Sequence, residues 1–162
     1  MNDRQYRAVY NGIYRLFDDV TPLRADCGML CGKACCKGDE NTGMLLFPHE
    51  ETAFKTIKSQ SGSLCVCNGV CERNDRPLSC RIFPLFPALD KNGNIKVIPD
   101  LRGADICPLV RQAENVSFDR RFLRHVRVTG KILSRDAECR EFLRKVTEQI
   151  EEISEIQNKF LK

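Results

Sequence analysis

Cysteines are the residues whose type and spacing could do chemistry, and eight of the ten lie between residues 27 and 80. The first run has the spacing C-x3-C-x3-C-C, and the second begins at Cys65 and ends at Cys80. Thiolates at this density form either a disulfide framework or a site for a soft metal.

The rest of the chain favours a metal site over disulfides. The N-terminus is polar and leads into an amphipathic pattern, so no secretion signal is visible. No run is long and apolar enough to span a bilayer. We therefore expect a cytoplasmic protein, and in a reducing compartment clustered cysteines are more often ligands than disulfides.

The predicted ligands come from both runs and from one cysteine downstream. The predicted metal ligands are Cys27, Cys31, Cys35, Cys36, Cys67, Cys71, Cys80 and Cys107. Either Cys65 or Cys67 could occupy one of these places, and eight thiolates suffice for two four-thiolate sites. Cys139 falls on the apolar stripe of a helix, where a buried structural cysteine is expected.

The identity of the metal is open between an iron–sulfur cluster and zinc. No C-x2-C pair and no histidine occur within the runs, which counts against the common zinc designs. Iron–sulfur clusters accept four thiolates at irregular spacings, and the adjacent Cys35 and Cys36 suit a multinuclear centre. We favour a [4Fe–4S] cluster, with zinc as the alternative.

Two segments resemble a known family, the cysteine-cluster proteins described as zinc- or iron-chelating and named for a CxxCxxCC-like motif. The first match runs from Cys27 to Gly38, and the second is Arg-Pro-Leu-Ser-Cys-Arg-Ile-Phe-Pro, residues 76–84. The resemblance covers roughly residues 27–110, and Cys71 lacks the tyrosine that usually follows it. It implies a metal site, and related clusters in flagellin lysine N-methylases suggest an enzyme component as one alternative.

Two arginines flank Cys80 and have two interpretations. Arg76 and Arg81 could offset the charge of clustered thiolates and favour ionised ligands. They could equally be surface residues in ordinary salt bridges. Phe83 and Phe86 could exclude water from the site.

The sequence contains few other motifs that indicate a specific chemistry. The sequence has no Walker loop and no dinucleotide fingerprint, and its only histidines are His49 and His125. Whether the protein is an enzyme is therefore left open, and no catalytic residue is predicted.

Periodic apolar residues predict the elements that must hold the cysteines. Over residues 3–19, apolar residues recur at the spacing of one helical face, which predicts a helix with Asp3 as its N-cap. A short strand is expected at 44–47, a helix from about 48 to 58, and two strands at 82–89 and 95–98 joined by an Asn-Gly turn. After residue 117, two helices extend to 160, with a break at Thr129-Gly130 and Ser134 as the second N-cap.

We therefore predict one domain over 1–162, a small and mostly helical α+β fold with a cysteine-cluster core at 27–110. The net charge of +4 is small, and basic residues are interleaved with acidic ones along the chain. Neither nucleic acid nor a membrane is therefore expected as a partner. An unknown protein could bind the C-terminal helix. The favoured function is metal binding with a structural or redox-linked role, and the third alternative is a zinc-stabilised interaction module.

Overall fold

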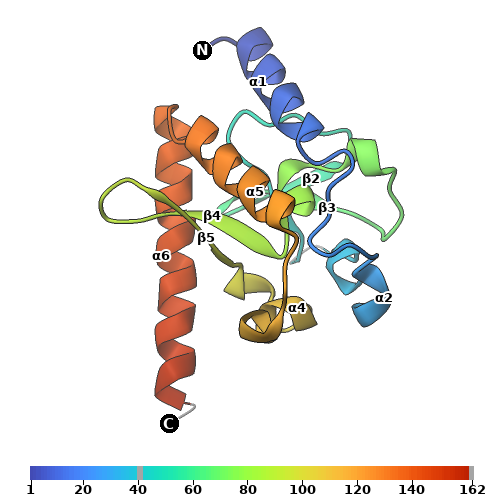
Figure 1. The fold of residues 1–162 in the computed structure, drawn as a ribbon. Helices are drawn as coiled ribbons and strands as arrows, with labels where there is room; N and C mark the ends of the chain where they lie inside the picture. Colours follow the sequence, from blue (N-terminus) through green and yellow to red (C-terminus); the bar gives the residue numbers. More distant parts are fainter. Residues whose placement is uncertain (40–41, 161–162) are drawn as a thin grey trace. The chain divides into compact units, whose positions relative to one another are not determined.

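The computed structural model describes residues 1–39 and 42–160, and its contacts group the chain into two compact units, Met1–Phe83 and Pro84–Lys162. Each unit has its own helices and one small antiparallel sheet (Figure 1). This arrangement confirms the predicted α+β class. The prediction of a single domain stays a prediction, and the units are described separately.

The N-terminal unit contains three helices, two 3₁₀ turns and three short strands. These elements are α1 (Asp3–Arg15), α2 (Gly28–Cys31), η1 (Ala34–Cys36), β1 (Met44–Leu45), β2 (Lys55–Ser59), β3 (Gly62–Val66), η2 (Arg73–Asp75) and α3 (Leu78–Ile82). The strands form one antiparallel sheet in the order β1-β3-β2, so β3 is central.

Helix α1 carries the predicted apolar face but has different ends. Its N-cap is Asn2, not Asp3, because the side chains of Asn2 and Gln5 satisfy each other's backbone N–H groups. The helix ends at Arg15, short of the predicted residue 19. The chain then turns away, and the guanidinium of Arg73 binds the carbonyl oxygens of Phe17 and Val20, each at 2.9 Å.

The helix predicted for residues 48–58 is wrong. Turns follow β1, and residues 55–59 form strand β2. His49 has a positive φ of 62°, which a right-handed helix does not allow. The carboxylate of Glu50, which follows this turn, binds groups from three other segments, as described below.

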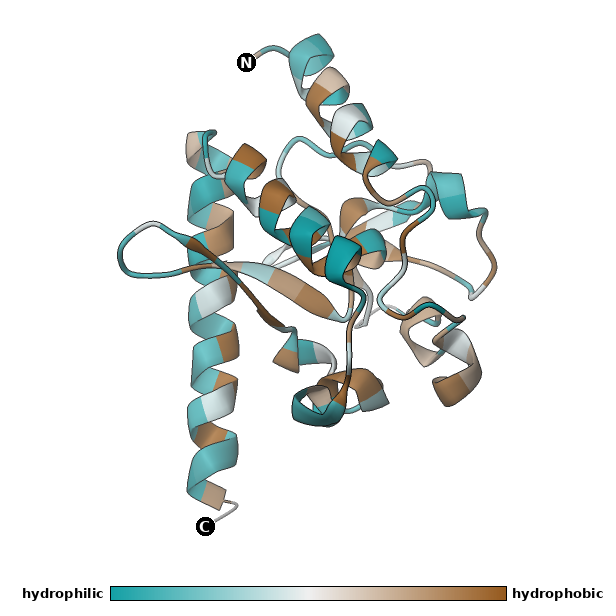
Figure 2. Ribbon diagram, viewed as in Figure 1, coloured by the Kyte–Doolittle hydropathy of each residue, from teal (hydrophilic) through white to brown (hydrophobic). Residues whose placement is uncertain are grey.

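The C-terminal unit contains a hairpin, two short turns and three helices. These elements are β4 (Leu85–Leu89), β5 (Ile95–Pro99), η3 (Leu101–Gly103), α4 (Pro108–Arg111), η4 (Ala113–Asn115), α5 (Arg120–Leu133) and α6 (Ala137–Phe160). The hairpin confirms the two strands predicted around the Asn-Gly turn. Helices α5 and α6 both pack against this hairpin. Figure 2 shows that apolar and polar residues are interspersed along each of these helices.

The predicted break at Thr129-Gly130 is wrong, because α5 continues through it to Leu133. A Cβ atom added to Gly130 would lie 2.6 Å from the Cβ of Pro87 and 2.8 Å from Ile95. The glycine therefore allows the helix to approach the hairpin closely, and it does not end the helix.

The N-cap of α6 also differs from the prediction. Asp136, not Ser134, accepts the N–H groups of Glu138 and Cys139. Cys139 is buried, as predicted. No helix among the described residues is long and apolar enough to cross a membrane.

Candidate metal centre

One cavity of about 520 Å³ in the N-terminal unit is lined by seven of the ten cysteines. All of the residues around it belong to Met1–Phe83. The cysteines in its wall are Cys27, Cys35, Cys36, Cys65, Cys67, Cys71 and Cys80. No disulfide is formed among the ten cysteines, all of which lie in the described part of the chain.

Tight turns bring the first cysteine run around one side of the cavity. Cys27 is the N-cap of α2 and Cys31 is its last residue. Gly32 and Lys33 then both adopt positive φ, 59° and 58°, which turns the chain directly into η1. This turn places the adjacent Cys35 and Cys36 in the cavity wall.

Backbone pairing holds the first run against the second. An isolated antiparallel bridge joins Lys37 to Asn68, and the N–H of Gly38 donates to the carbonyl of Cys67 at 2.9 Å. Gly43 approaches so closely that an added Cβ would lie 2.6 Å from the carbonyl oxygen of Cys65. The two runs are thus neighbours, although 28 residues lie between Cys36 and Cys65 in the sequence.

Strand β3 and helix α3 supply the other side of the cavity. Cys65 lies in the central strand and is only 2% exposed, and Cys67 follows just beyond the strand end. Cys71 belongs to the loop before η2, and Cys80 lies within α3. The hydroxyl of Ser79 donates to the carbonyl of Leu45, which ties α3 to β1 beside these thiols.

A buried carboxylate fixes the start of α3. Glu50 accepts the N–H of Leu78, the hydroxyl of Tyr14 at 2.7 Å and the N–H of Phe47 at 3.1 Å. Burial raises the pKa of Glu50, and these donors act in the opposite direction. Glu50 therefore joins α1, the turn after β1 and the helix that carries Cys80.

The two arginines that flank Cys80 have different environments. The Nε of Arg76 donates to the sulfur of Cys71 at 3.3 Å, and the Cys71, Cys36 and Cys80 thiols favour its charged form. Arg81 is 8% exposed and donates to the carbonyl oxygens of Arg76, Asn74 and Tyr14. Arg76 can therefore interact with the cysteines, whereas Arg81 holds the backbone of the preceding loop.

Two thiols of the cavity, Cys35 and Cys80, resist ionisation in the absence of a ligand. Burial, together with the neighbouring Cys36, Cys31 and Cys27, raises the pKa of Cys35 to about 12. Burial also raises the pKa of Cys80 well above its ordinary value, with contributions from Cys65, Cys36, Cys35 and Cys71. A cation that binds these sulfurs would have to displace protons from them.

The cavity brings together most of the predicted ligands, with two exceptions. Six of the eight predicted cysteines line it, whereas Cys31 does not and Cys107 is buried in the C-terminal unit. Among residues 1–39 and 42–160, no three His, Cys, Asp or Glu side chains are already arranged to hold a metal ion. Binding would therefore require the sulfurs to move inward.

Sequence reasoning left one residue of this site open and missed two others. Cys65 was an alternative to Cys67 in the prediction, and both line the cavity. Arg73 lines the cavity as well, and its Nε is buried without a hydrogen-bond partner among the described residues. No sequence signal distinguishes Arg73 or Glu50 from ordinary surface charges.

Comparisons with known proteins add no relative. The chain matches no protein-family model, and neither a curated protein nor a solved structure is similar to it. The resemblance to the zinc- or iron-chelating cysteine-cluster family therefore stays a prediction based on its motifs.

Proposed function

We propose that the N-terminal unit binds a thiophilic metal centre, an iron–sulfur cluster or zinc, in its cysteine-lined cavity. The observation that carries this proposal is the convergence of seven cysteines from two sequence runs on one cavity. Thiolates are the preferred ligands of soft metals, so seven cysteines around one cavity favour a metal site.

The surroundings of the thiols support an anionic metal–thiolate centre. Four thiolates carry more negative charge than a zinc ion or a cluster core neutralises, so a nearby cation stabilises the complex. Arg76 already donates to the sulfur of Cys71, and Arg73 lines the same wall. Val20, Phe54 and Phe83 add apolar surface that limits access of water.

The size of the cavity favours a multinuclear centre. A single zinc ion holds its sulfurs at about 2.3 Å, so it fills only a small part of 520 Å³. A cluster of several irons fits the available space with less inward movement of the walls. We therefore favour an iron–sulfur centre over a single zinc ion.

The test is metal analysis and an absorption spectrum of protein purified without oxygen, for the wild type, Cys80→Ser and Cys139→Ser. We expect bound iron and sulfide in the wild type, a loss of most metal in Cys80→Ser, and full metal content in Cys139→Ser. Circular dichroism checks that each variant is folded.

Three outcomes would revise the proposal. A wild type that contains stoichiometric zinc and no iron identifies zinc as the metal. A folded wild type that binds neither metal would refute metal binding. Loss of metal from Cys139→Ser but not from Cys80→Ser would place the site in the C-terminal unit and contradict the proposed location.

A further inference from the structure

Helix α5, in the C-terminal unit, concentrates positive charge that the rest of the chain balances. Residues 120–135, which cover α5 and the two residues after it, contain six Arg and Lys residues and no Asp or Glu. The whole chain has a net charge of only +4, so its other residues together carry a small negative charge. The interleaving of charges along most of the sequence therefore does not hold in this helix.

Four of these cations lie on one face of α5, and all four are exposed. This set, here called the cationic stripe, consists of Arg120, Arg124, Arg127 and Lys131. Spacings of three and four residues place the four positions within about 60° of one another around the helix axis. The stripe extends for about 16 Å along the helix, since each residue adds about 1.5 Å.

The buried face of α5 fixes the direction in which the stripe points. Phe122 and Val126 are 0% exposed and Leu133 is 3% exposed, and the helix packs against the hairpin β4–β5. At 3.6 residues per turn these three positions lie on the side of the helix opposite the stripe. The stripe therefore points away from the hairpin. Within residues 1–39 and 42–160, none of its four side chains forms an ion pair or a side-chain hydrogen bond.

The stripe is unfavourable for the helix by itself. Like charges three or four residues apart on a helix repel and destabilise it by a few tenths of a kcal/mol per pair. Helix α6 shows the contrasting arrangement, because Arg144 pairs there with both Glu141 and Glu148. A bound polyanion would remove the repulsion in α5, and guanidinium groups bind phosphate in a bidentate manner.

The surroundings of the stripe favour a nucleic acid duplex over other polyanions. A membrane-surface helix inserts large apolar side chains, and a protein interface has apolar anchors at its centre. None of the exposed large apolar side chains in the described part of the chain lies on α5. Single strands bind through stacked aromatic rings, yet Phe122, the one Phe, Tyr or Trp of this helix, is buried. The phosphate backbone of a duplex is bound by charge alone.

We infer that α5 binds the phosphate backbone of a double-stranded nucleic acid through the cationic stripe. This activity belongs to the C-terminal unit and requires no metal. Contacts to phosphate carry no sequence information, so the binding is independent of base sequence. It goes beyond the metal binding proposed for the N-terminal unit, and either can fail without the other.

Fluorescence anisotropy of labelled DNA and RNA duplexes of about 20 base pairs, titrated with the full chain at several salt concentrations, tests this inference. Four phosphate contacts predict a slope of about −3.6 in log K against log salt, and thus a roughly 100-fold loss of affinity between about 50 and 200 mM salt. The DNA and RNA arms show which duplex is bound.

Two charge-matched variants separate the stripe from overall charge. The stripe variant replaces all four residues with Gln, and the control variant makes the same replacement at four exposed lysines of the C-terminal unit outside α5, Lys91, Lys96, Lys145 and Lys159. We expect the stripe variant to bind at least about tenfold more weakly at low salt, with a slope near zero, and the control variant to retain most of the affinity. Circular dichroism checks folding, and Arg124→Gln with Arg127→Gln replaces the stripe variant if it does not fold.

Three outcomes would overturn the inference. The first is a folded wild type that binds neither duplex at low salt. The second is an equal loss of affinity in the stripe and control variants, which would assign binding to overall charge. The third is displacement of the duplex by polyglutamate at lower concentration than by unlabelled duplex, which would indicate an acidic protein partner.

Discussion

Single residues show how the sequence motif divides into different roles. The Arg-Pro-x-x-Cys-Arg segment contains two arginines that the sequence treats alike, since both flank Cys80. In the structure Arg76 contacts a cavity thiol, whereas Arg81 binds three backbone carbonyl groups and stacks over the ring of Tyr14 at 4.5 Å. The difference depends on tertiary contacts with α1, which spacing along the chain does not reveal.

Substitution of these two arginines should therefore separate stability from metal binding. Arg81→Met leaves three carbonyl oxygens without their donor, so we expect the free energy of unfolding of the metal-free protein to fall by about 3 kcal/mol. Arg76→Met should change this free energy by less than about 1 kcal/mol but weaken metal binding. Urea unfolding and a competition titration with a metal chelator measure the two effects. Equal effects of both variants on stability would contradict the assignment.

At the scale of elements, strongly periodic segments could be predicted and segments governed by tertiary contacts could not. The apolar faces of α1, α5 and α6 and the hairpin β4–β5 follow from the sequence pattern. The helix predicted at 48–58 is absent: the carboxylate of Glu50 binds Tyr14 and Leu78, which lie far away in the sequence, and residues 55–59 form strand β2. The convergence of the cysteine runs was expected, but the backbone bridge at Lys37 and Asn68 that produces it has no sequence signature.

Two glycines within helices should respond in opposite ways to alanine. Gly130→Ala places a Cβ within 2.6 Å of Pro87, so we expect a loss of about 1–3 kcal/mol of stability. Gly12 in α1 has no heavy atom within 4 Å of the added Cβ, so Gly12→Ala should stabilise the protein by up to about 1 kcal/mol. Thermal unfolding of both variants tests the prediction. Stabilisation by Gly130→Ala would show that α5 does not approach the hairpin this closely.

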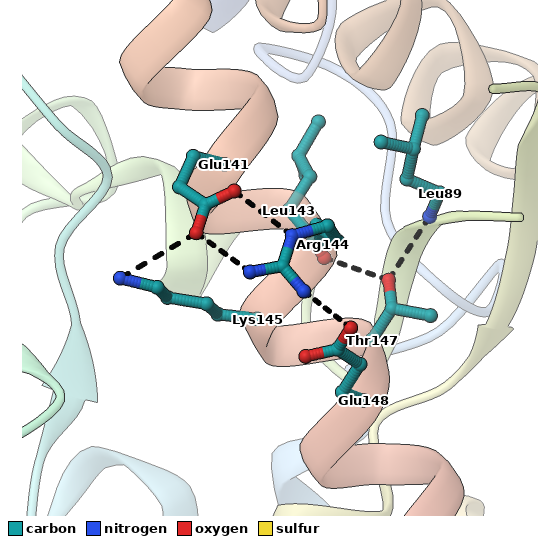
Figure 3. Close-up of polar contacts among 7 residues, drawn as sticks. All are labelled: Leu89, Glu141, Leu143, Arg144, Lys145, Thr147 and Glu148. Atoms are coloured by element: carbon teal, nitrogen blue, oxygen red, sulfur yellow. Dashed lines mark hydrogen bonds and ion pairs between the residues drawn. The ribbon is translucent and has the colours of Figure 1, made fainter. Parts of the chain in front are cut away.

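Helix α6 provides a second matched pair of variants (Figure 3). Thr147 accepts the N–H of Leu89 at 3.0 Å and donates to the carbonyl of Leu143 at 2.7 Å. Thr147→Val leaves the partly buried N–H of Leu89 without its acceptor, so we expect a loss of about 1–3 kcal/mol. Arg144 pairs with Glu141 and Glu148 on the exposed surface, so Arg144→Ala should cost no more than about 1 kcal/mol. A larger effect for Arg144→Ala would contradict this ranking.

At the scale of the whole molecule, the thiols are unevenly divided between the two units. Met1–Phe83 contains eight cysteines, seven of which line one cavity, whereas Cys107 and Cys139 are buried individually in Pro84–Lys162. The C-terminal unit has a packed apolar core of its own. Metal should therefore stabilise the N-terminal unit selectively, because ligand binding to the folded state adds directly to stability.

Removal of metal is expected to affect the two units differently. After treatment with a strong chelator under anaerobic conditions, amide hydrogen exchange should increase across residues 27–80 and remain nearly unchanged in α5 and α6. The readout is hydrogen–deuterium exchange measured by mass spectrometry on peptides from each unit. Increased exchange confined to α5 and α6 would contradict the location of the metal centre.

X-ray absorption spectroscopy at the edge of the bound metal, on anaerobically prepared wild-type protein, tests the central claim most directly. An all-cysteine centre predicts a first coordination shell dominated by sulfur at about 2.3 Å, together with metal–metal scattering if the centre is an iron–sulfur cluster. A first shell dominated by nitrogen and oxygen would contradict the account, because the cysteines of the cavity would then not be the ligands.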